Sequence, residues 1–159
     1  MVIHVDDWKK RLDDVFQKKA AYEQKLAEER QKAAPAHAQQ FSLVAELFDS
    51  TINPAFEEVR SELLTHGSEA NIVLAHPSAR PGSRLASAIE IDEGLTRFGY
   101  EIYARISPTG YNLNTRVQVD NYKTARHDLT QSPLPTTSSR EDIINDVVEQ
   151  YVEAITAHL

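Results

Sequence analysis

Residues 98–120, FGYEIYARISPTGYNLNTRVQVD, decide the fold class of this chain. Apolar and polar side chains alternate on both sides of Pro108, Thr109 and Gly110, and a period of two is typical of half-buried β-strands. A short loop with proline and glycine between two such runs predicts a β-hairpin. One face of the hairpin is apolar and the other polar, so we expect an antiparallel sheet with one face in water.

Two further runs upstream have strand character and are separated by the breaker-rich loop 77–83. Together with the hairpin they predict a four-stranded antiparallel meander, whose strands cover residues 69–76, 84–92, 98–107 and 111–120. Residues 121–139 are polar and contain Pro133 and Pro135, so the sequence predicts a loop there.

Helical segments flank the predicted sheet. Residues 36–66 carry a broad apolar stripe with a 3.6-residue period, which predicts the main core helix over the apolar face of the sheet. The stripe keeps its phase across Pro54, so we expect a bend there and not a helix end. A last amphipathic helix is expected at 140–158, with Ser138 or Ser139 as its cap.

Residues 6–33 predict a densely charged N-terminal helix with a heptad-like seam. The seam positions alternate in spacing between four and three: Trp8, Leu12, Val15, Lys19, Tyr22, Leu26, Glu29 and Ala33. Pro35 is expected to break or kink the helix. The seam must be buried either against the second helix of the same chain or against another chain, and we favour the second outcome, a homodimer.

The predicted fold class is therefore α+β: a long coiled-coil-like helix, a core helix, a four-stranded antiparallel meander and a C-terminal helix on the sheet or the core helix. Residues 1–34 are predicted to form a charged amphipathic oligomerisation helix, and residues 35–159 a single α+β domain. The length of 159 residues fits one domain of ordinary size.

Composition excludes several classes of function. The absence of cysteine excludes disulfides, cysteine nucleophiles and thiolate metal sites. The net charge of −7 argues against a nucleic-acid partner, which would need clustered cations. No apolar run approaches the length of a membrane span and the first residues do not resemble a signal peptide, so we expect a cytoplasmic protein without a membrane partner.

Motifs of catalysis are missing from the sequence. There is no glycine-rich phosphate loop, nucleophile elbow or HExxH helix. None of the six histidines lies at metal-ligand spacing from another. The sequence therefore predicts no catalytic residue, no metal and no cofactor, and it favours a non-enzymatic role.

Five residues are candidates for binding. Tyr103, Arg105 and Arg116 are predicted on the polar face of the sheet, and both residue types are favoured at recognition surfaces. The simpler interpretation is cross-strand pairing of these arginines with glutamates on a solvated face. Arg80 and Arg84 belong to the loop between the first two strands, and loops of this kind often bind ligands.

Two functions are consistent with these observations. The first is a protein–protein interaction or assembly module that self-associates through its N-terminal helices and offers its polar sheet face to a protein partner. The alternative is a small-ligand-binding or enzymatic domain with a site between the sheet and the helices. That site would use Tyr103, Arg105, Arg116 or His76.

Overall fold

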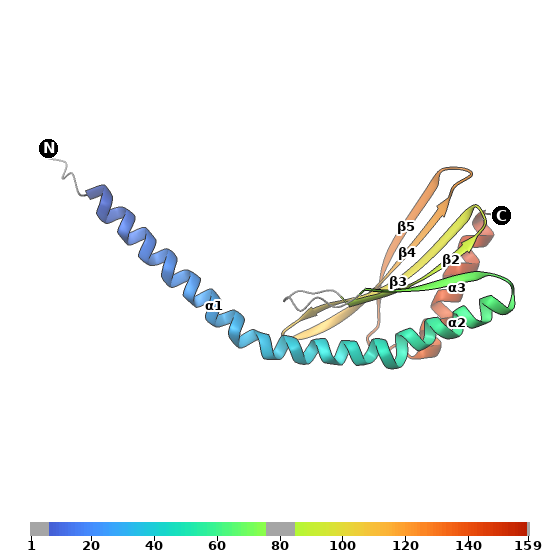
Figure 1. Cartoon of the computed structure of the whole chain (residues 1–159), viewed down its shortest axis with the longest axis horizontal. Helices are drawn as coiled ribbons and strands as arrows, with labels where there is room; N and C mark the ends of the chain where they lie inside the picture. Colours follow the sequence, from blue (N-terminus) through green and yellow to red (C-terminus); the bar gives the residue numbers. More distant parts are fainter. Residues whose placement is uncertain (1–6, 76–84, 159) are drawn as a thin grey trace.

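The computed structural model of the chain describes residues 7–75 and 85–158 and confirms the α+β class with an antiparallel sheet. A helical run made of three segments is followed by the strands and a C-terminal helix (Figure 1). The elements are α1 (Asp7–Leu47), η1 (Phe48–Ile52), α2 (Asn53–Thr65), β1 (Glu69–Ala75), β2 (Leu85–Glu93), β3 (Thr96–Ser107), β4 (Gly110–Asn121), β5 (Arg126–Leu134) and α3 (Arg140–His158).

The sheet is a meander of five strands in the order β1-β2-β3-β4-β5, and the prediction of four strands is wrong. Residues 126–134, predicted as part of a loop, form β5 and pair antiparallel with β4. The side chains of this edge strand are mostly exposed on both faces, so burial imposes no alternating pattern on its sequence. Pro133 is tolerated because an edge strand has one unpaired side.

The N-terminal helix does not break at Pro35. The α-helical run α1 passes through this proline and continues through η1 and α2, so one helical rod extends over residues 7–65. Figure 1 shows that α1 changes direction before it reaches the sheet. A bend is the usual response of a helix to an internal proline, because the ring removes one hydrogen bond and crowds the preceding turn.

A π-helical turn precedes the second proline. The backbone N–H of Asn53 donates to the carbonyl of Phe48, five residues earlier. Pro54 then lies in the first turn of α2, directly after this π-helical turn. The apolar stripe continues through this point, as predicted, because Phe48, Ile52 and Phe56 are all buried.

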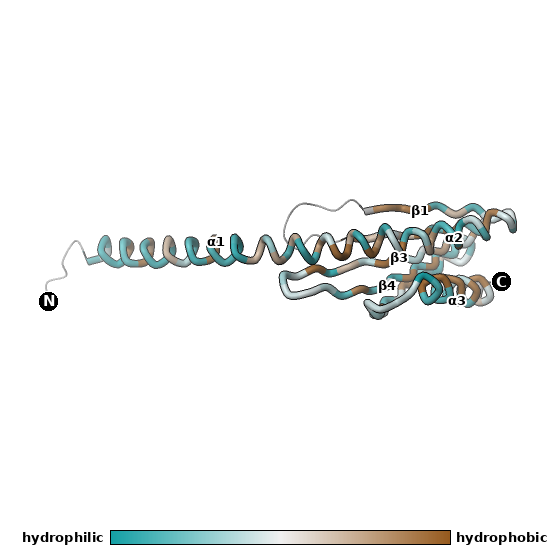
Figure 2. Tube along the Cα trace, turned by 90° about the horizontal axis from the view of Figure 1, so that it is seen from below, coloured by the Kyte–Doolittle hydropathy of each residue, from teal (hydrophilic) through white to brown (hydrophobic). Residues whose placement is uncertain are grey.

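The core lies between one face of the sheet and the end of α1 together with η1, α2 and α3 (Figures 1 and 2). Phe98, Tyr100 and Ile102 of β3 are fully buried at its centre. The ring of Phe56 meets Tyr100 edge-on, with the ring centroids 6.0 Å apart. The predicted roofing of the apolar sheet face by the central helix is thus confirmed.

Candidate functional site

The most unusual feature of the molecule is the part of α1 that extends beyond the sheet (Figure 1). We call residues 7–32 the arm. Every side chain of the arm is exposed except that of Leu26, which is partly buried. Trp8, Leu12, Val15, Phe16 and Tyr22 keep 47% to 64% of their surface in water. The described chain therefore does not fold the arm back on the core helix, which was the first of the two predicted outcomes.

The apolar side of the arm continues the side of the helix that faces the core. Trp8, Leu26 and Val44 are each 18 residues apart, which is five turns of an α-helix. Val44 is fully buried and belongs to the hydrophobic core. The same face of one helix is thus covered by the sheet at its C-terminal end and bare at its N-terminal end.

Charged residues cover the rest of the arm. Arg11 and Asp7 form an ion pair of 3.5 Å one turn apart, and the ammonium of Lys9 lies 5.6 Å from the centre of the Trp8 ring. Exposed pairs of this kind contribute only about 0–1 kcal/mol. They therefore add little to the stability of the arm, and its large apolar side chains remain exposed.

The structure places the three predicted residues of the polar sheet face on β3 and β4. Tyr103 lies opposite Asn114, Arg105 opposite Asn112 and Arg116 opposite Glu101. All three belong to the face opposite the core, because the alternate residues Ile102, Ala104 and Ile106 are buried in the core.

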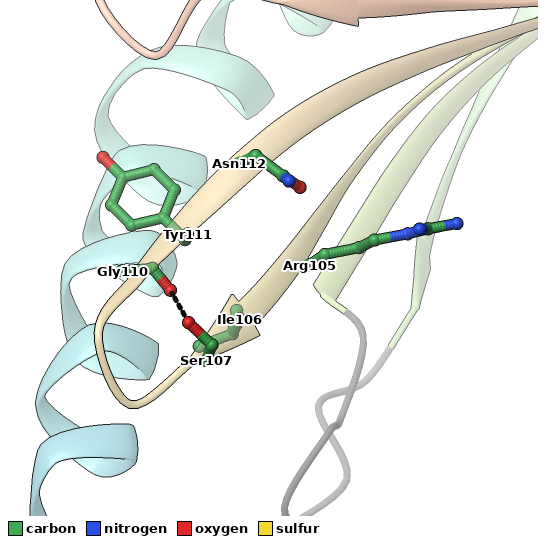
Figure 3. A pocket seen from close by; sticks show the side chains of 6 residues that line it. All are labelled: Arg105, Ile106, Ser107, Gly110, Tyr111 and Asn112. Atoms are coloured by element: carbon green, nitrogen blue, oxygen red, sulfur yellow. Dashed lines mark hydrogen bonds between the residues drawn. The ribbon is translucent and has the colours of Figure 1, made fainter.

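These three side chains do not form one group. Tyr103 is buried, and Arg105 is exposed near the β3–β4 turn. Arg105 and Arg116 are four rungs apart along the β3–β4 ladder. Figure 3 shows Arg105 and Asn112 extending to one side of the hairpin and Tyr111 to the other, around a shallow hollow of about 350 Å³. Arg80 and Arg84, together with His76 and the loop 77–83, lie outside the described residues.

A polar cluster on the same face was missed by sequence reasoning. Glu90, Arg97, Gln118 and Asp120 surround Gly99, whose missing side chain leaves a hollow of about 100 Å³. Nη2 of Arg97 donates to Glu90 at 2.5 Å.

The charged groups of this polar cluster have partners on the same sheet face. The carboxylate of Asp120 accepts hydrogen bonds from Nε2 of Gln118, at 3.1 Å, and from Nδ1 of His127. The hydrogen bond with Glu90 raises the pKa of Arg97 further above its usual value. Burial opposes ionisation of Asp120, but its hydrogen bonds outweigh this and lower its pKa. The cluster is therefore a satisfied ion-pair network that stabilises the sheet.

The cluster escaped prediction for two reasons. Arg97 lay just outside the predicted strand 98–107, although its side chain falls on the same face as Gly99 and Glu101. His127 reaches Asp120 only because β5 pairs with β4, and the sequence of β5 carries no periodic signal. Among the described residues, no three histidine or acidic side chains are grouped closely enough to hold a metal ion.

An apolar groove of about 470 Å³ runs between α2 and α3. Val59, Leu63, Ile144 and Val148 are among its apolar lining residues. Glu58 and Glu62 lie at the α2 side, where Glu58 binds Nη2 of Arg140 at 2.6 Å.

None of the helices in the described part of the chain is both long and apolar enough to cross a membrane. Comparison of the chain with protein-family models, with curated proteins and with solved structures found no significant match.

Proposed function

We propose that this chain is a non-enzymatic assembly module that self-associates through its arm. The observation that carries the proposal is the row of large apolar side chains, Trp8, Leu12, Val15 and Tyr22, that no other part of the described chain covers. Side chains of this size at heptad spacing are the usual contact surface of paired helices. A second copy of the chain supplies the same surface, which makes a symmetric dimer the simplest partner.

The expected strength of this association follows from the exposed area. Full burial of a large apolar side chain contributes about 1.5–3 kcal/mol of favourable free energy. A side chain that is half exposed in the single chain therefore gains about 1 kcal/mol when a partner covers it. About ten such side chains in a dimer supply about 10 kcal/mol, against an association cost of about 4–15 kcal/mol. We therefore expect a reversible dimer whose population depends on concentration.

The test is the mass of the full-length chain in solution, measured by light scattering over a range of concentrations. We expect a dimer that dissociates on dilution. Replacing Leu12 and Tyr22 together by Ser should shift the equilibrium to monomer, and deleting residues 1–34 should have the same effect. Gln17→Ser is the matched control, because Gln17 is exposed on the opposite side of the arm. A wild-type chain that stays monomeric at all concentrations would contradict the proposal.

A second candidate function is the binding of an apolar small molecule in the groove between α2 and α3. Its volume of about 470 Å³ falls in the range of ligand sites, and its floor is apolar with a few polar groups at the rim. Nile red, an uncharged apolar dye, should gain fluorescence with the wild-type protein, and Val148→Asp should abolish the gain. Leu95→Asp is the control, since Leu95 is exposed in a turn outside the groove. Equal fluorescence with both variants would exclude the groove.

A further inference from the structure

We infer that two arms pair antiparallel, with Lys19 of one copy opposite the partner's Glu29. The inference rests on the proposed self-association and adds the orientation and register of the contact. The two charged positions of the seam are the observation that decides between the orientations.

A parallel pair aligns each seam residue with its own copy. Lys19 would then face the partner's Lys19, and Glu29 would face the partner's Glu29, inside an otherwise apolar contact. Like charges placed together and removed from water strongly disfavour this arrangement. The seam consists of the a and d positions of the heptad, and Lys19 and Glu29 occupy different ones of the two. In an antiparallel pair each a position faces a d position of the partner. Lys19 can therefore face the partner's Glu29, and this contact occurs twice per dimer.

Side-chain size supports the same register. When Lys19 is opposite the partner's Glu29, every seam pair has residue numbers that add up to 48. The remaining pairs are Tyr22 with the partner's Leu26, Val15 with the partner's Ala33, Leu12 with the partner's Ala36, and Trp8 with the partner's Gln40. Large side chains of the arm tip therefore meet smaller ones near the partner's sheet, which is how well-packed layers interdigitate.

The charge of the whole molecule also favours this orientation. Residues 1–34 contain eight basic and seven acidic side chains, so the remaining residues carry nine basic and seventeen acidic ones, a net charge of −8. A parallel pair would place two such acidic bodies side by side. The antiparallel pair places them at opposite ends of the paired arms, beyond the screening length of physiological salt.

One feature of the arm opposes close pairing. Arg11, Lys18, Lys25 and Lys32 form a basic row beside the seam, with a spacing of seven residues. In the antiparallel register this row faces the same row of the partner at the exposed edge of the contact. Exposed charges interact weakly and are screened by salt, whereas the seam charges lie inside the contact. Added salt should therefore strengthen the dimer.

Charge reversal tests the orientation in the full-length chain. Lys19→Glu alone and Glu29→Lys alone each turn two opposite-charge contacts into like-charge contacts, and each should raise the dissociation constant about tenfold. The double variant Lys19→Glu/Glu29→Lys should restore the wild-type value. In a parallel pair the single reversals only exchange one like-charge contact for another. Single variants that dimerise as well as the wild type would therefore overturn the inference.

A distance measurement provides an independent readout, because the chain has no cysteine and a single introduced thiol is unique. In Lys10→Cys carrying a spin label, the antiparallel register separates the two labels by 28 residues, or roughly 42 Å along the helix axis. A parallel pair brings them within about 20 Å, since paired helices lie about 10 Å apart. Close labels in a dimer overturn only the antiparallel inference, whereas a monomeric wild-type chain overturns the self-association itself.

Discussion

Two tyrosine hydroxyls hold α3 to the rest of the molecule. The hydroxyl of Tyr100 on β3 donates to Asp146 of α3, and the hydroxyl of Tyr151 on α3 donates to Glu93 at the end of β2. Oγ of Ser68 donates to the same carboxylate oxygen of Glu93 at 2.8 Å. Burial, together with the carboxylate partner, raises the pKa of both tyrosines, that of Tyr151 to about 12.

These shifts predict a loss of stability in alkali. A tyrosine with a raised pKa binds its proton more tightly in the folded chain, so its contribution is complete below the unfolded value of about 10. The contribution of Tyr151 disappears as the pH rises towards about 12. Tyr151→Phe should unfold about 1 kcal/mol more easily than the wild type at pH 8, through loss of one hydrogen bond.

The measurement is urea unfolding, followed by circular dichroism between pH 8 and pH 11. We expect the difference between wild type and Tyr151→Phe to shrink as the pH rises, because deprotonation removes the same hydrogen bond from the wild type. Tyr122→Phe is the control for loss of a tyrosine hydroxyl elsewhere, since Tyr122 is largely exposed and hydrogen-bonds Arg97 of the sheet, not a carboxylate that holds α3. Curves for Tyr151→Phe and wild type that remain parallel over this range would contradict the assignment.

At the scale of single elements, the start of α3 is a reciprocal cap. Oγ of Ser139 accepts from the backbone N–H of Asp142 at 3.1 Å, and the carboxylate of Asp142 accepts from the backbone N–H of Ser139 at 2.9 Å. These hydrogen bonds lower the pKa of Asp142. The sequence left Ser138 and Ser139 as alternative caps, and the structure assigns the cap to Ser139 because Ser138 donates to the carbonyl of Pro135 instead.

Removing this cap should weaken the docking of α3. Ser139→Ala removes the side-chain partner of the Asp142 backbone N–H and should lower the free energy of unfolding by about 1 kcal/mol. Thermal unfolding should show a lower midpoint, while Ser139→Asp, which preserves a capping oxygen, should stay near the wild type. An unchanged midpoint in Ser139→Ala would contradict the prediction, because water would then satisfy this N–H group equally well.

The edge strand β5 depends on a side-chain turn. Oδ1 of Asn121 accepts from the backbone N–H groups of Lys123 and Thr124, at 3.1 Å and 3.2 Å. Asparagine commonly closes turns in this way. This turn reverses the chain after β4, and Ala125 completes the reversal with a φ of 55°. The turn residue was visible in the sequence, but the strand that follows it was not.

At the scale of the whole molecule, one helical rod joins two different environments. Its C-terminal half is covered by the sheet, and its N-terminal part, the arm, extends beyond it (Figure 2). Length explains this shape: the 59 residues from Asp7 to Thr65 span almost 90 Å at 1.5 Å per residue. The longest strands have 12 residues and cover only about 40 Å. A sheet of this size cannot cover such a rod, so the remaining apolar surface is available to another molecule.

The sequence by itself determined the α+β class, the β3–β4 hairpin, the main core stripe and the position of α3. Each of these elements has one buried and one exposed face. Apolar residues therefore recur with a period of two in the strands and of 3.6 in the helices. Phe98, Tyr100 and Ile102 lie on the apolar face of the predicted hairpin, and they are buried in the core. The seam of the arm was recognised in the same way.

Tertiary structure alone decided the remaining features. β5 has no consistently buried face, so its pairing with β4 left no period to recognise. Asp120 and His127 meet because of that pairing, and Tyr103 lies buried although it belongs to the polar face. From the sequence, the seam of the arm could pack against the second helix of the same chain or against another chain. The helix continues through Pro35, so the arm does not fold back on the same chain. Local patterns record whether a side chain is buried, whereas the identity of its neighbours depends on how distant segments pack.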